Sequence, residues 1–199
     1  PIIVCPAMEH HMYNHPATQN NLETLKSRGV TVVEPGSGRL ASGLVGQGRL
    51  ADLDTIVGTI RWVLGRKGDL AGRRIVVTAG GTREAIDPVR FVTNRSSGKM
   101  GHAVVEAARD RGADVTLVTT AAVPADVAIG VDVRPVTSAL EMYEAVQEAV
   151  RGADALVMAA AVADYRPASP ADKKLKKQDN DDTGWQLELV RNPDIIASV

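Results

Sequence analysis

The sequence is poor in aromatic residues, has a single cysteine and carries almost no net charge. Aromatic residues make up 3% of the chain, so its core must consist mainly of Val, Ala, Leu and Ile, as in α/β proteins. Cys5 alone excludes an intramolecular disulfide and is compatible with a reducing cytoplasm, where we expect the protein to act. A net charge of -1 favours neither nucleic acid nor a membrane surface as a partner.

Length and hydrophobic content leave room for one large or two small domains. The chain has 199 residues, 44% of them hydrophobic, which is ample for a folded core. No signal peptide or membrane-spanning run is visible. The sequence opens with the apolar run PIIVCPAM, without an initiator methionine, and closes in DIIASV, which is typical of a helix start. We therefore expect it to be part of a longer protein.

The first third of the chain predicts two strands, two helices and a glycine-rich loop. The strands are expected at 2–5 and 30–33, and the helices at 18–28 and about 53–64. Glycine recurs through residues 34–49, which predicts a loop that is either a clamp over a ligand or simple surface slack.

A short charged stretch punctuated by glycine, GRKGDLAG, separates two units. We assign residues 1–65 to the first unit, 66–72 to a linker and 73–199 to the second unit. The second unit is expected to have strands at 75–78, 114–119 and 155–160 and helices at 99–111 and 139–150. This alternation predicts an α/β fold with a Rossmann-like, doubly wound parallel sheet and ligand sites at the carboxyl ends of its strands.

The end of the sequence is mostly polar. Residues 170–184 have too few apolar side chains for a core, which predicts a mobile flap. Residues 185–190 alternate as in a strand, and Asn192, Pro193 and Asp194 are typical of the turn that caps a helix.

The stretch from Ile75 to Gly101 has the layout of an anion-binding site. Gly80 and Gly81 follow a predicted buried strand, and their backbone N–H groups can approach an anionic oxygen. Ser96-Ser97-Gly98 then precedes a helix, whose first N–H groups and dipole favour phosphate or carboxylate. Cationic and amide side chains lie between or beside these glycines, namely Arg83, Arg90, Asn94, Arg95 and Lys99. The alternative is a long crossover loop with solvated basic residues.

Two common nucleotide-binding patterns fit this stretch poorly. The glycines do not follow GxGxxG, and Thr119-Thr120-Ala121 stands where a ribose-binding acid is expected in a nicotinamide-dependent Rossmann oxidoreductase. SSGKMG lacks the upstream glycine and the Ser or Thr after lysine that a phosphate-binding P-loop requires. An NAD(P)-dependent oxidoreductase and a non-catalytic nucleotide-binding regulatory domain remain alternatives.

Four separate motifs carry a family resemblance. TAGGTREAIDPVRFVTNRSSGKMG, MAAAVADYRP, KKLKKQ and RNPDI, in this order, resemble the ligase half of the bifunctional phosphopantothenoylcysteine decarboxylase and phosphopantothenate-cysteine ligase of coenzyme A synthesis. PAMEHHMYNHPATQNNL and SGRLASGLVGQGRL resemble the end of its flavin-dependent decarboxylase half. The resemblance implies that the C-terminal part of a flavodoxin-like flavoprotein decarboxylase unit precedes a truncated ligase unit. It also implies a homo-oligomer.

For the second unit, the resemblance implies a ligation in two steps. The carboxylate of 4'-phosphopantothenate attacks the α-phosphate of CTP, with Mg2+, and cysteine then captures the acyl-cytidylate. Asn94 matches the residue that handles this intermediate, and its amide can donate to the acyl oxygen as charge develops there. Lys174 matches a lysine that reaches the triphosphate, although neighbouring lysines in the flap match almost as well. Alternatively, Asn94 is a turn residue and Lys174 is solvated.

Further site residues are expected from these motifs. The carboxylate of Asp164 can accept a hydrogen bond from the cytosine amino group, or Asp164 can serve only as a turn residue. The expected nucleotide-binding residues are Gly80, Gly81, Met158, Ala159, Ala160, Asp164, Lys174, Asn192, Pro193 and Asp194. The expected substrate-binding residues are Glu9, Arg90, Asn94 and Lys99.

The first unit departs from the decarboxylase pattern at two positions, although the resemblance implies that it binds FMN. Glu9 stands where the family has asparagine, and it places a negative charge near the substrate carboxylate. Ser42 stands where the family has the cysteine that donates a proton, and a hydroxyl is a much weaker acid than a thiol. We therefore expect altered proton delivery. The histidines near Glu9 lack the HExxH spacing of a zinc site, so no metal site is expected.

Overall fold

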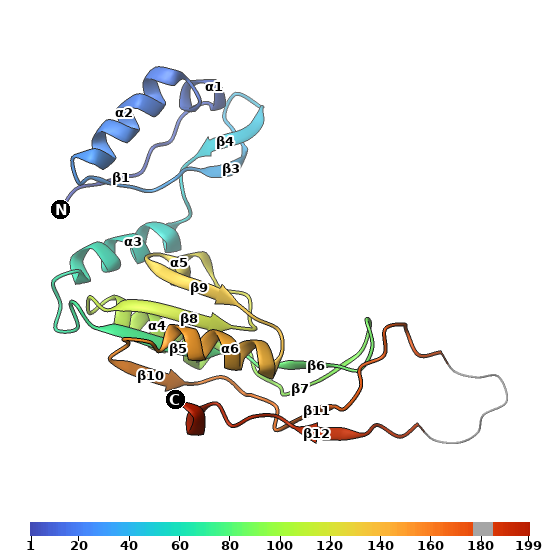
Figure 1. The fold of residues 1–199 in the computed structure, drawn as a ribbon. Helices are drawn as coiled ribbons and strands as arrows, with labels where there is room; N and C mark the ends of the chain where they lie inside the picture. The colour runs from blue at the N-terminus through green and yellow to red at the C-terminus, as the bar shows by residue number, and fades with distance from the viewer. Residues whose placement is uncertain (177–184) are drawn as a thin grey trace.

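A computed structural model describes residues 1–176 and 185–199 of the chain (Figure 1). The first unit contains a two-stranded parallel sheet, two helices and an antiparallel hairpin. Its elements are β1 (Ile3–Val4), α1 (His10–Tyr13), α2 (Pro16–Ser27), β2 (Thr31–Val32), β3 (Gly36–Arg39) and β4 (Val45–Arg49).

The hairpin β3–β4 corrects the prediction of a loop at 34–49. Its strands pair in register from Ser37 opposite Gln47 to Arg39 opposite Val45. The recurrent glycines left a clamp and surface slack as alternatives, but glycine also permits close approach of extended backbones. A Cβ atom at Gly48 would lie 2.1 Å from the carbonyl oxygen of Met8. The backbone N–H of Met8 donates to the carbonyl of Gly48 at 2.8 Å, so the hairpin is joined to the turn before α1.

The second unit is an α/β layer structure around a four-stranded parallel sheet of order β10-β5-β8-β9. The predicted alternation of strands and helices is confirmed, but β9 and the short helix α5 were not predicted. The strands are β5 (Arg74–Ala79), β8 (Asp114–Thr119), β9 (Val131–Pro135) and β10 (Ala155–Met158). The helices are α4 (Lys99–Arg109), α5 (Ala125–Ala128) and α6 (Ala139–Ala149).

Alternate residues of the central strands face opposite layers of helices. Val77 and Leu117 pack with Val105 of α4 in one cluster. Val76 and Val118 pack with α6 in a second cluster that also contains Ile195. All the valines and the leucine are at most 2% exposed, and each contributes roughly 1.5–3 kcal/mol by burial. The sheet is therefore covered on both faces, as predicted.

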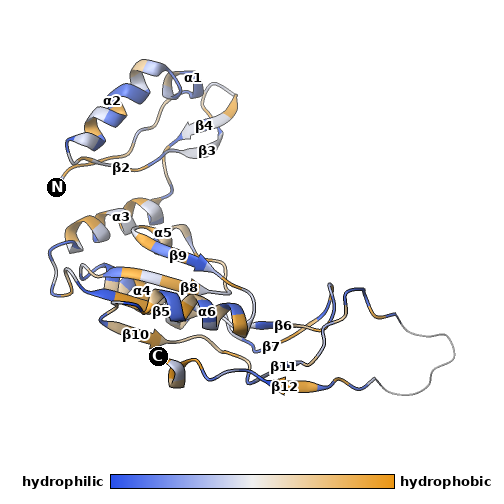
Figure 2. Cartoon of the chain, in the orientation of Figure 1, coloured by the Kyte–Doolittle hydropathy of each residue, from blue (hydrophilic) through white to orange (hydrophobic). Residues whose placement is uncertain are grey.

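Helix α3 (Leu53–Gly65) packs against the second unit (Figure 1). A Cβ atom at Gly58 would lie 3.1 Å from the side chain of Ile129, just beyond α5, so small residues allow the helices to approach closely. The linker that follows is also docked, because Leu70 donates to the carbonyl of Arg111 at 3.0 Å. The opposite face of α3 is apolar and exposed, and Figure 2 shows α3 as largely hydrophobic. Its exposed residues are Leu53, Val57, Ile60 and Leu64.

Two further hairpins extend from the sheet. They are formed by β6 (Arg83–Ala85) with β7 (Phe91–Thr93) and by β11 (Tyr165–Pro167) with β12 (Leu189–Arg191). The chain closes with the 3-10 helix η1 (Ile196–Ser198). The predicted flap lies partly outside the described residues, since 177–184 are not described. Across the described part of the chain, the helices are too short or too polar to cross a membrane.

Arg109 connects α4 to α5 from within the core. Its side chain is fully buried, and Nη1 donates to the carbonyl groups of Asp126 at 2.5 Å and of Val127 at 3.3 Å. Asp110 balances its charge through a hydrogen bond of 2.9 Å from Arg109 Nε. One buried guanidinium therefore satisfies carbonyl groups that α5 leaves without helical partners.

We predict that Arg109→Met lowers the free energy of unfolding by about 3 kcal/mol, because buried carbonyl groups lose a charged donor. Urea unfolding followed by circular dichroism measures this loss. Arg111→Met is the matched control, because Arg111 pairs with Asp69 at an exposed position and should change stability much less. Equal unfolding midpoints for the two variants would contradict this role of Arg109.

Candidate functional site

The candidate site lies where the neighbouring strands β5 and β10 end. Beyond the strands, Gly81 and Ala161 continue the parallel pairing as an isolated bridge. Ala161 donates to the carbonyl of Gly80 at 2.7 Å and accepts from Thr82 at 3.3 Å. From β5 the chain builds the sheet outward in one direction, through β8 and β9, and then returns to the other side of β5 to form β10. The order in which strands are added therefore reverses at β5. Open α/β sheets bind ligands at such reversal points.

The glycine pair allows two other segments to approach the end of β5. Gly80 has φ of 89°, and a Cβ atom there would lie 2.3 Å from Thr120 Oγ1. A Cβ atom at Gly81 would lie 2.6 Å from the carbonyl oxygen of Asn94. Both positions therefore require glycine, because a larger side chain would collide with Thr120 or with the backbone of Asn94.

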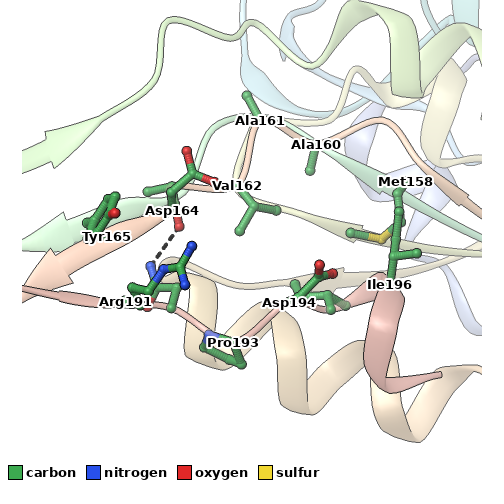
Figure 3. Close-up of a pocket in the computed structure, with 13 residues that line it drawn as sticks. Met158, Ala160, Ala161, Val162, Asp164, Tyr165, Arg191, Pro193, Asp194 and Ile196 are labelled. Atoms are coloured by element: carbon green, nitrogen blue, oxygen red, sulfur yellow. Dashed lines mark hydrogen bonds between the residues drawn. The ribbon is translucent and has the colours of Figure 1, made fainter.

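A cleft of about 860 Å3 opens beside the end of β10. Figure 3 shows that one wall comes from the segment 158–165 and the other from 191–196. The cleft is lined by six of the residues predicted to bind nucleotide. They are Met158, Ala160, Asp164, Asn192, Pro193 and Asp194.

These polar residues have different tasks in the cleft. Asn192 donates from Nδ2 to the carbonyl of Ala163 at 2.8 Å and accepts from Arg166 at 3.0 Å, so its amide holds the two walls together. Asp194 accepts from the N–H of Ala197 at 3.1 Å. The side chain of Asp164 is exposed and makes no hydrogen bond to another described residue. Asp164 is therefore the carboxylate best placed to meet a ligand.

Asn94 lies at a second, smaller cavity of about 230 Å3. Its Nδ2 group lies 3.4 Å from the carbonyl oxygen of Ala161 and 3.3 Å from that of Val162. Both carbonyl groups belong to residues that line the larger cleft. Asn94 therefore stands at the boundary between the two cavities. The smaller one is lined by Gly81, Arg83, Phe91, Thr93, Asn94, Arg95, Ser96, Thr120 and Ala121.

The start of α4 differs in detail from the expected serine cap. Its N-cap is Gly98, with φ of 77°, and no side chain caps the first turn. A Cβ atom at Gly98 would lie 3.4 Å from the backbone nitrogen of Gly80. The two glycine segments predicted as anion cradles therefore adjoin one another. Lys99 is the first helical residue and is exposed.

Arg90 is held by a buried carboxylate instead of pointing freely into a cavity. Its Nε donates to Asp87 Oδ2 at 2.9 Å, and its Nη2 donates to the same oxygen at 2.5 Å and to the carbonyl of Leu175 at 2.9 Å. Leu175 in turn donates to Asp87 at 3.1 Å. This pair therefore anchors the segment that carries Lys174, which is exposed and lines neither cavity.

In the first unit, Glu9 and Ser42 line a common cavity of about 310 Å3. The carboxylate of Glu9 also caps α1, accepting from the N–H groups of His11 at 2.7 Å and Met12 at 3.3 Å. Burial raises the pKa of Glu9, but the hydrogen bonds from His11 and Met12 outweigh it, so the pKa lies below its ordinary value. Glu9 is therefore ionised at neutral pH and turned toward the helix.

Sequence reasoning missed two buried threonines at the site. Thr78 Oγ1 accepts from the N–H of Ala160 at 3.1 Å, and Thr82 Oγ1 accepts from the N–H of Ala163 at 2.9 Å. Both side chains belong to fully buried residues. The only signal in the sequence is the pair of threonines that flanks the glycines in TAGGT.

Comparison with known proteins identifies the family. The model of the DNA/pantothenate metabolism flavoprotein C-terminal domain matches residues 70–199, which is more than half of the chain. The chain belongs to this family. A second model, described as flavoprotein, matches residues 1–65. The chain is 47% identical over 203 residues to the coenzyme A biosynthesis bifunctional protein CoaBC of Mycobacterium bovis.

Related sequences and structures extend beyond the chain. The coenzyme A biosynthesis bifunctional protein CoaBC of Vibrio cholerae is 45% identical over 199 residues. All of the chain is covered in both comparisons, but it spans only 48% and 49% of these relatives. In the DNA/pantothenate metabolism flavoprotein family, the crystal structure of the C-terminal domain of a CoaBC protein superposes with a TM-score of 0.53 and 42% identity. The superposed region covers 64% of this chain and 57% of the chain in that structure.

The Asp87–Arg90 pair should make the anchored segment depend on pH. Hydrogen bonds from Arg90, with others from the backbone of Val89 and Leu175, hold the pKa of Asp87 far below its ordinary value of 3.8. Because the pKa is depressed in the folded state, ionised Asp87 stabilises the fold above pH 3.8. This contribution is lost as the pH falls from 3.8 toward the folded-state pKa.

We predict that Asp87→Asn is less stable than the unaltered chain at neutral pH and that the difference shrinks progressively below pH 3.8. Unfolding in urea across this pH range measures the difference. Amide hydrogen exchange at Leu175 should rise in the variant at neutral pH, because its acceptor is weakened. A stability difference that stays constant through the acidic range would contradict the assignment.

Proposed function

We propose that the longer protein ligates 4'-phosphopantothenate to cysteine at the expense of CTP and decarboxylates the product with FMN. The observation that carries the ligase part is the position of Asn94 between two cavities at the ends of β5 and β10. A reaction between a nucleotide and an acid needs two adjoining sites with a hydrogen-bond donor where they meet. The similarity to CoaBC proteins across the chain supports the same assignment.

In this proposal, the larger cleft takes the nucleotide. The free carboxylate of Asp164 accepts from the amino group of cytosine, and the amide of Asn192 holds the wall behind it. Phosphate oxygens extend from the cleft toward Gly81, which lines the smaller cavity, and toward the uncapped start of α4, which adjoins Gly80. The described residues form no cluster of three metal-ligating side chains, so Mg2+ would be held mainly by the triphosphate.

The smaller cavity takes the acid substrate. Arg83 and Arg95 line it and supply positive charge for the phosphate of phosphopantothenate. Asn94 then lies between the nucleotide and the carboxyl group of the acid substrate. Its amide N–H donates to the acyl oxygen of the acyl-cytidylate. Its present contacts of 3.3 and 3.4 Å are long, so the amide can turn toward the intermediate at little cost.

Lys174 acts from the segment held by Asp87 and Arg90. The N–H and the carbonyl group of Leu175 are both hydrogen-bonded, so the backbone beside Lys174 is held in place while the lysine side chain stays flexible. The triphosphate attracts this ammonium group during the first step. Arg90 thus serves the substrate site by positioning the segment, and Lys99 adds positive charge at the helix start.

The first unit performs the decarboxylation in this proposal, supported by its flavoprotein match. FMN, when bound, supplies reversible electron acceptance. Met8 and Leu50 give the 310 Å3 cavity an apolar wall, and Ser42 contributes a hydroxyl group. The carboxylate of Glu9 is occupied by α1, which reduces its repulsion of an acidic substrate. Related flavin sites assemble between subunits, so we expect a homo-oligomer.

We predict that full-length protein releases pyrophosphate and CMP over many turnovers only when CTP, phosphopantothenate and cysteine are all present. A coupled pyrophosphate assay and chromatography of CMP measure the two steps. A non-catalytic nucleotide-binding domain would bind CTP without turnover. Binding without release would therefore reject the ligase and favour that alternative.

Variants at two positions separate the steps of the same reaction. Asn94→Ala should accumulate acyl-cytidylate and slow its capture by cysteine about 100-fold, because the developing negative charge loses a donor. Lys174→Ala should instead weaken CTP binding or the first step. Lys176→Ala tests whether a neighbouring lysine of the same segment takes this role instead. Small and equal losses in the first two variants would support turn and solvated roles for these residues.

We predict that the full-length protein retains FMN and releases carbon dioxide from phosphopantothenoyl-cysteine by a route that Ser42 limits. Ser42→Cys should raise the rate at least about tenfold, because a thiol is a stronger acid than a hydroxyl group. Absorbance of bound flavin and trapped carbon dioxide are the measurements. Ser42→Ala with an unchanged rate would remove Ser42 from proton donation, and protein purified without FMN would reject the flavoprotein assignment.

A further inference from the structure

Thr82 makes hydrogen bonds to both cavities through three different atoms. Its Oγ1 accepts from the N–H of Ala163 at 2.9 Å, and its own N–H donates to the carbonyl of Ala161 at 3.3 Å. Its carbonyl oxygen accepts from Thr93 Oγ1 at 2.7 Å. Ala161 and Ala163 line the nucleotide cleft, whereas Thr93 lines the smaller cavity beside Asn94.

The hydroxyl group of Thr82 has a well-defined environment. Thr82 is 0% exposed and Ala163 is 7% exposed, so water does not readily replace the bond between them. Ala163 directly precedes Asp164, and Asn192 holds its carbonyl from the other side at 2.8 Å. Asp164 therefore follows a residue whose N–H and carbonyl groups are both held by hydrogen bonds.

Thr78, on β5, provides an internal comparison. It is equally buried, and its Oγ1 accepts from the N–H of Ala160 at 3.1 Å. Ala160 lines the nucleotide cleft only. Within the described residues, no side chain of the β6–β7 hairpin bonds to Thr78, whereas Thr93 of that hairpin donates to the backbone carbonyl of Thr82. The two threonines therefore differ in how many cavities they contact.

We propose that Thr82 is a positioning residue that sets Asp164 and Asn94 in one geometry, so that nucleotide and acid substrate meet at the reacting distance. The inference rests on the proposed ligase function. A displacement of about 1 Å in either group is enough to slow such a reaction up to 100-fold. Thr82 acts through the backbone and does not itself touch the reacting atoms.

The test uses full-length protein with Thr82→Val, Thr82→Ser and Thr78→Val. Valine keeps the shape of threonine but leaves the N–H of Ala163 or Ala160 without its acceptor. Thr82→Val should weaken CTP binding about tenfold by calorimetry and slow cysteine capture in single-turnover experiments by about the same factor. Thr82→Ser should restore both, and Thr78→Val should weaken CTP binding while leaving the rate of capture unchanged.

Thr93→Val supplies an independent variant if Thr82→Val does not fold. It removes the bonds from Thr93 Oγ1 to the carbonyl groups of Thr82 at 2.7 Å and of Asn94 at 3.3 Å and leaves the contacts of Ala163 intact, so it should slow capture without changing CTP affinity. Thr93→Ser should restore the rate. Hydrogen exchange at Ala163, measured by NMR, should rise in Thr82→Val and remain low in Thr82→Ser.

Three outcomes would overturn the inference. If Thr82→Val folds and keeps the CTP affinity and capture rate of the unaltered protein, Thr82 has no positioning role while the proposed ligase stands. If Thr82→Val does not fold, an unchanged rate of capture in Thr93→Val has the same meaning. If unaltered protein neither binds CTP nor releases pyrophosphate, the proposed function fails and the inference falls with it.

Discussion

The hydrogen bonds that join the chain just beyond β5 to the chain just beyond β10 are the constraint on which the site depends. Parallel strands normally diverge into separate loops at their carboxyl ends. Here the pairing continues through Gly81 and Ala161, and threonine hydroxyl groups on either side of the glycines add bonds to the same segment. These two loops are therefore held to each other by hydrogen bonds, as the strands before them are.

This continuation explains why two cavities adjoin without a carboxylate between them. Where the cavities meet, the walls are held by backbone groups, hydroxyl groups and the amide of Asn94, which are neutral. Arg166 and Asp194 support the far wall of the larger cleft. Charged groups stand at the margins, where Asp164 is exposed and Asp87 compensates Arg90. A site built in this way can receive a highly anionic ligand without first displacing buried counter-charges.

Much of the fold could be predicted because its elements carry regular patterns. The strand at 114–119 was placed without error, since its apolar residues are bounded by Gly112 and by the polar end of the sheet. Strand β9 was missed because VDVRP is only five residues long and ends in proline, although its apolar and charged residues alternate as in a strand. The hairpin β3–β4 was missed because glycine carries no side-chain periodicity from which a strand can be predicted.

The site was predictable where a side chain or a bare backbone must face a ligand, as at Gly80 and Asp164, and their roles stay predictions. The partners of Arg90 could not be predicted, because Leu175 lies 85 residues away and contributes only backbone atoms. The roles of Thr78 and Thr82 could not be predicted for the same reason, because their hydroxyl groups bond to Ala160 and Ala163, about 80 residues further along the chain.

The packing of α3 against α5 changes where the two units can pivot. The glycine-punctuated stretch at 66–72 looks like a hinge, yet it is fastened to Arg111 and Asp110 at the end of α4. Bending must then occur before Leu53, where one span of chain leads from β4 into α3 (Figure 1). Helix α3 therefore moves together with the second unit. Rotation of the preceding elements relative to α3 depends on the backbone of residues 50–52. The glycines of the linker do not add flexibility, because the linker is packed against the end of α4.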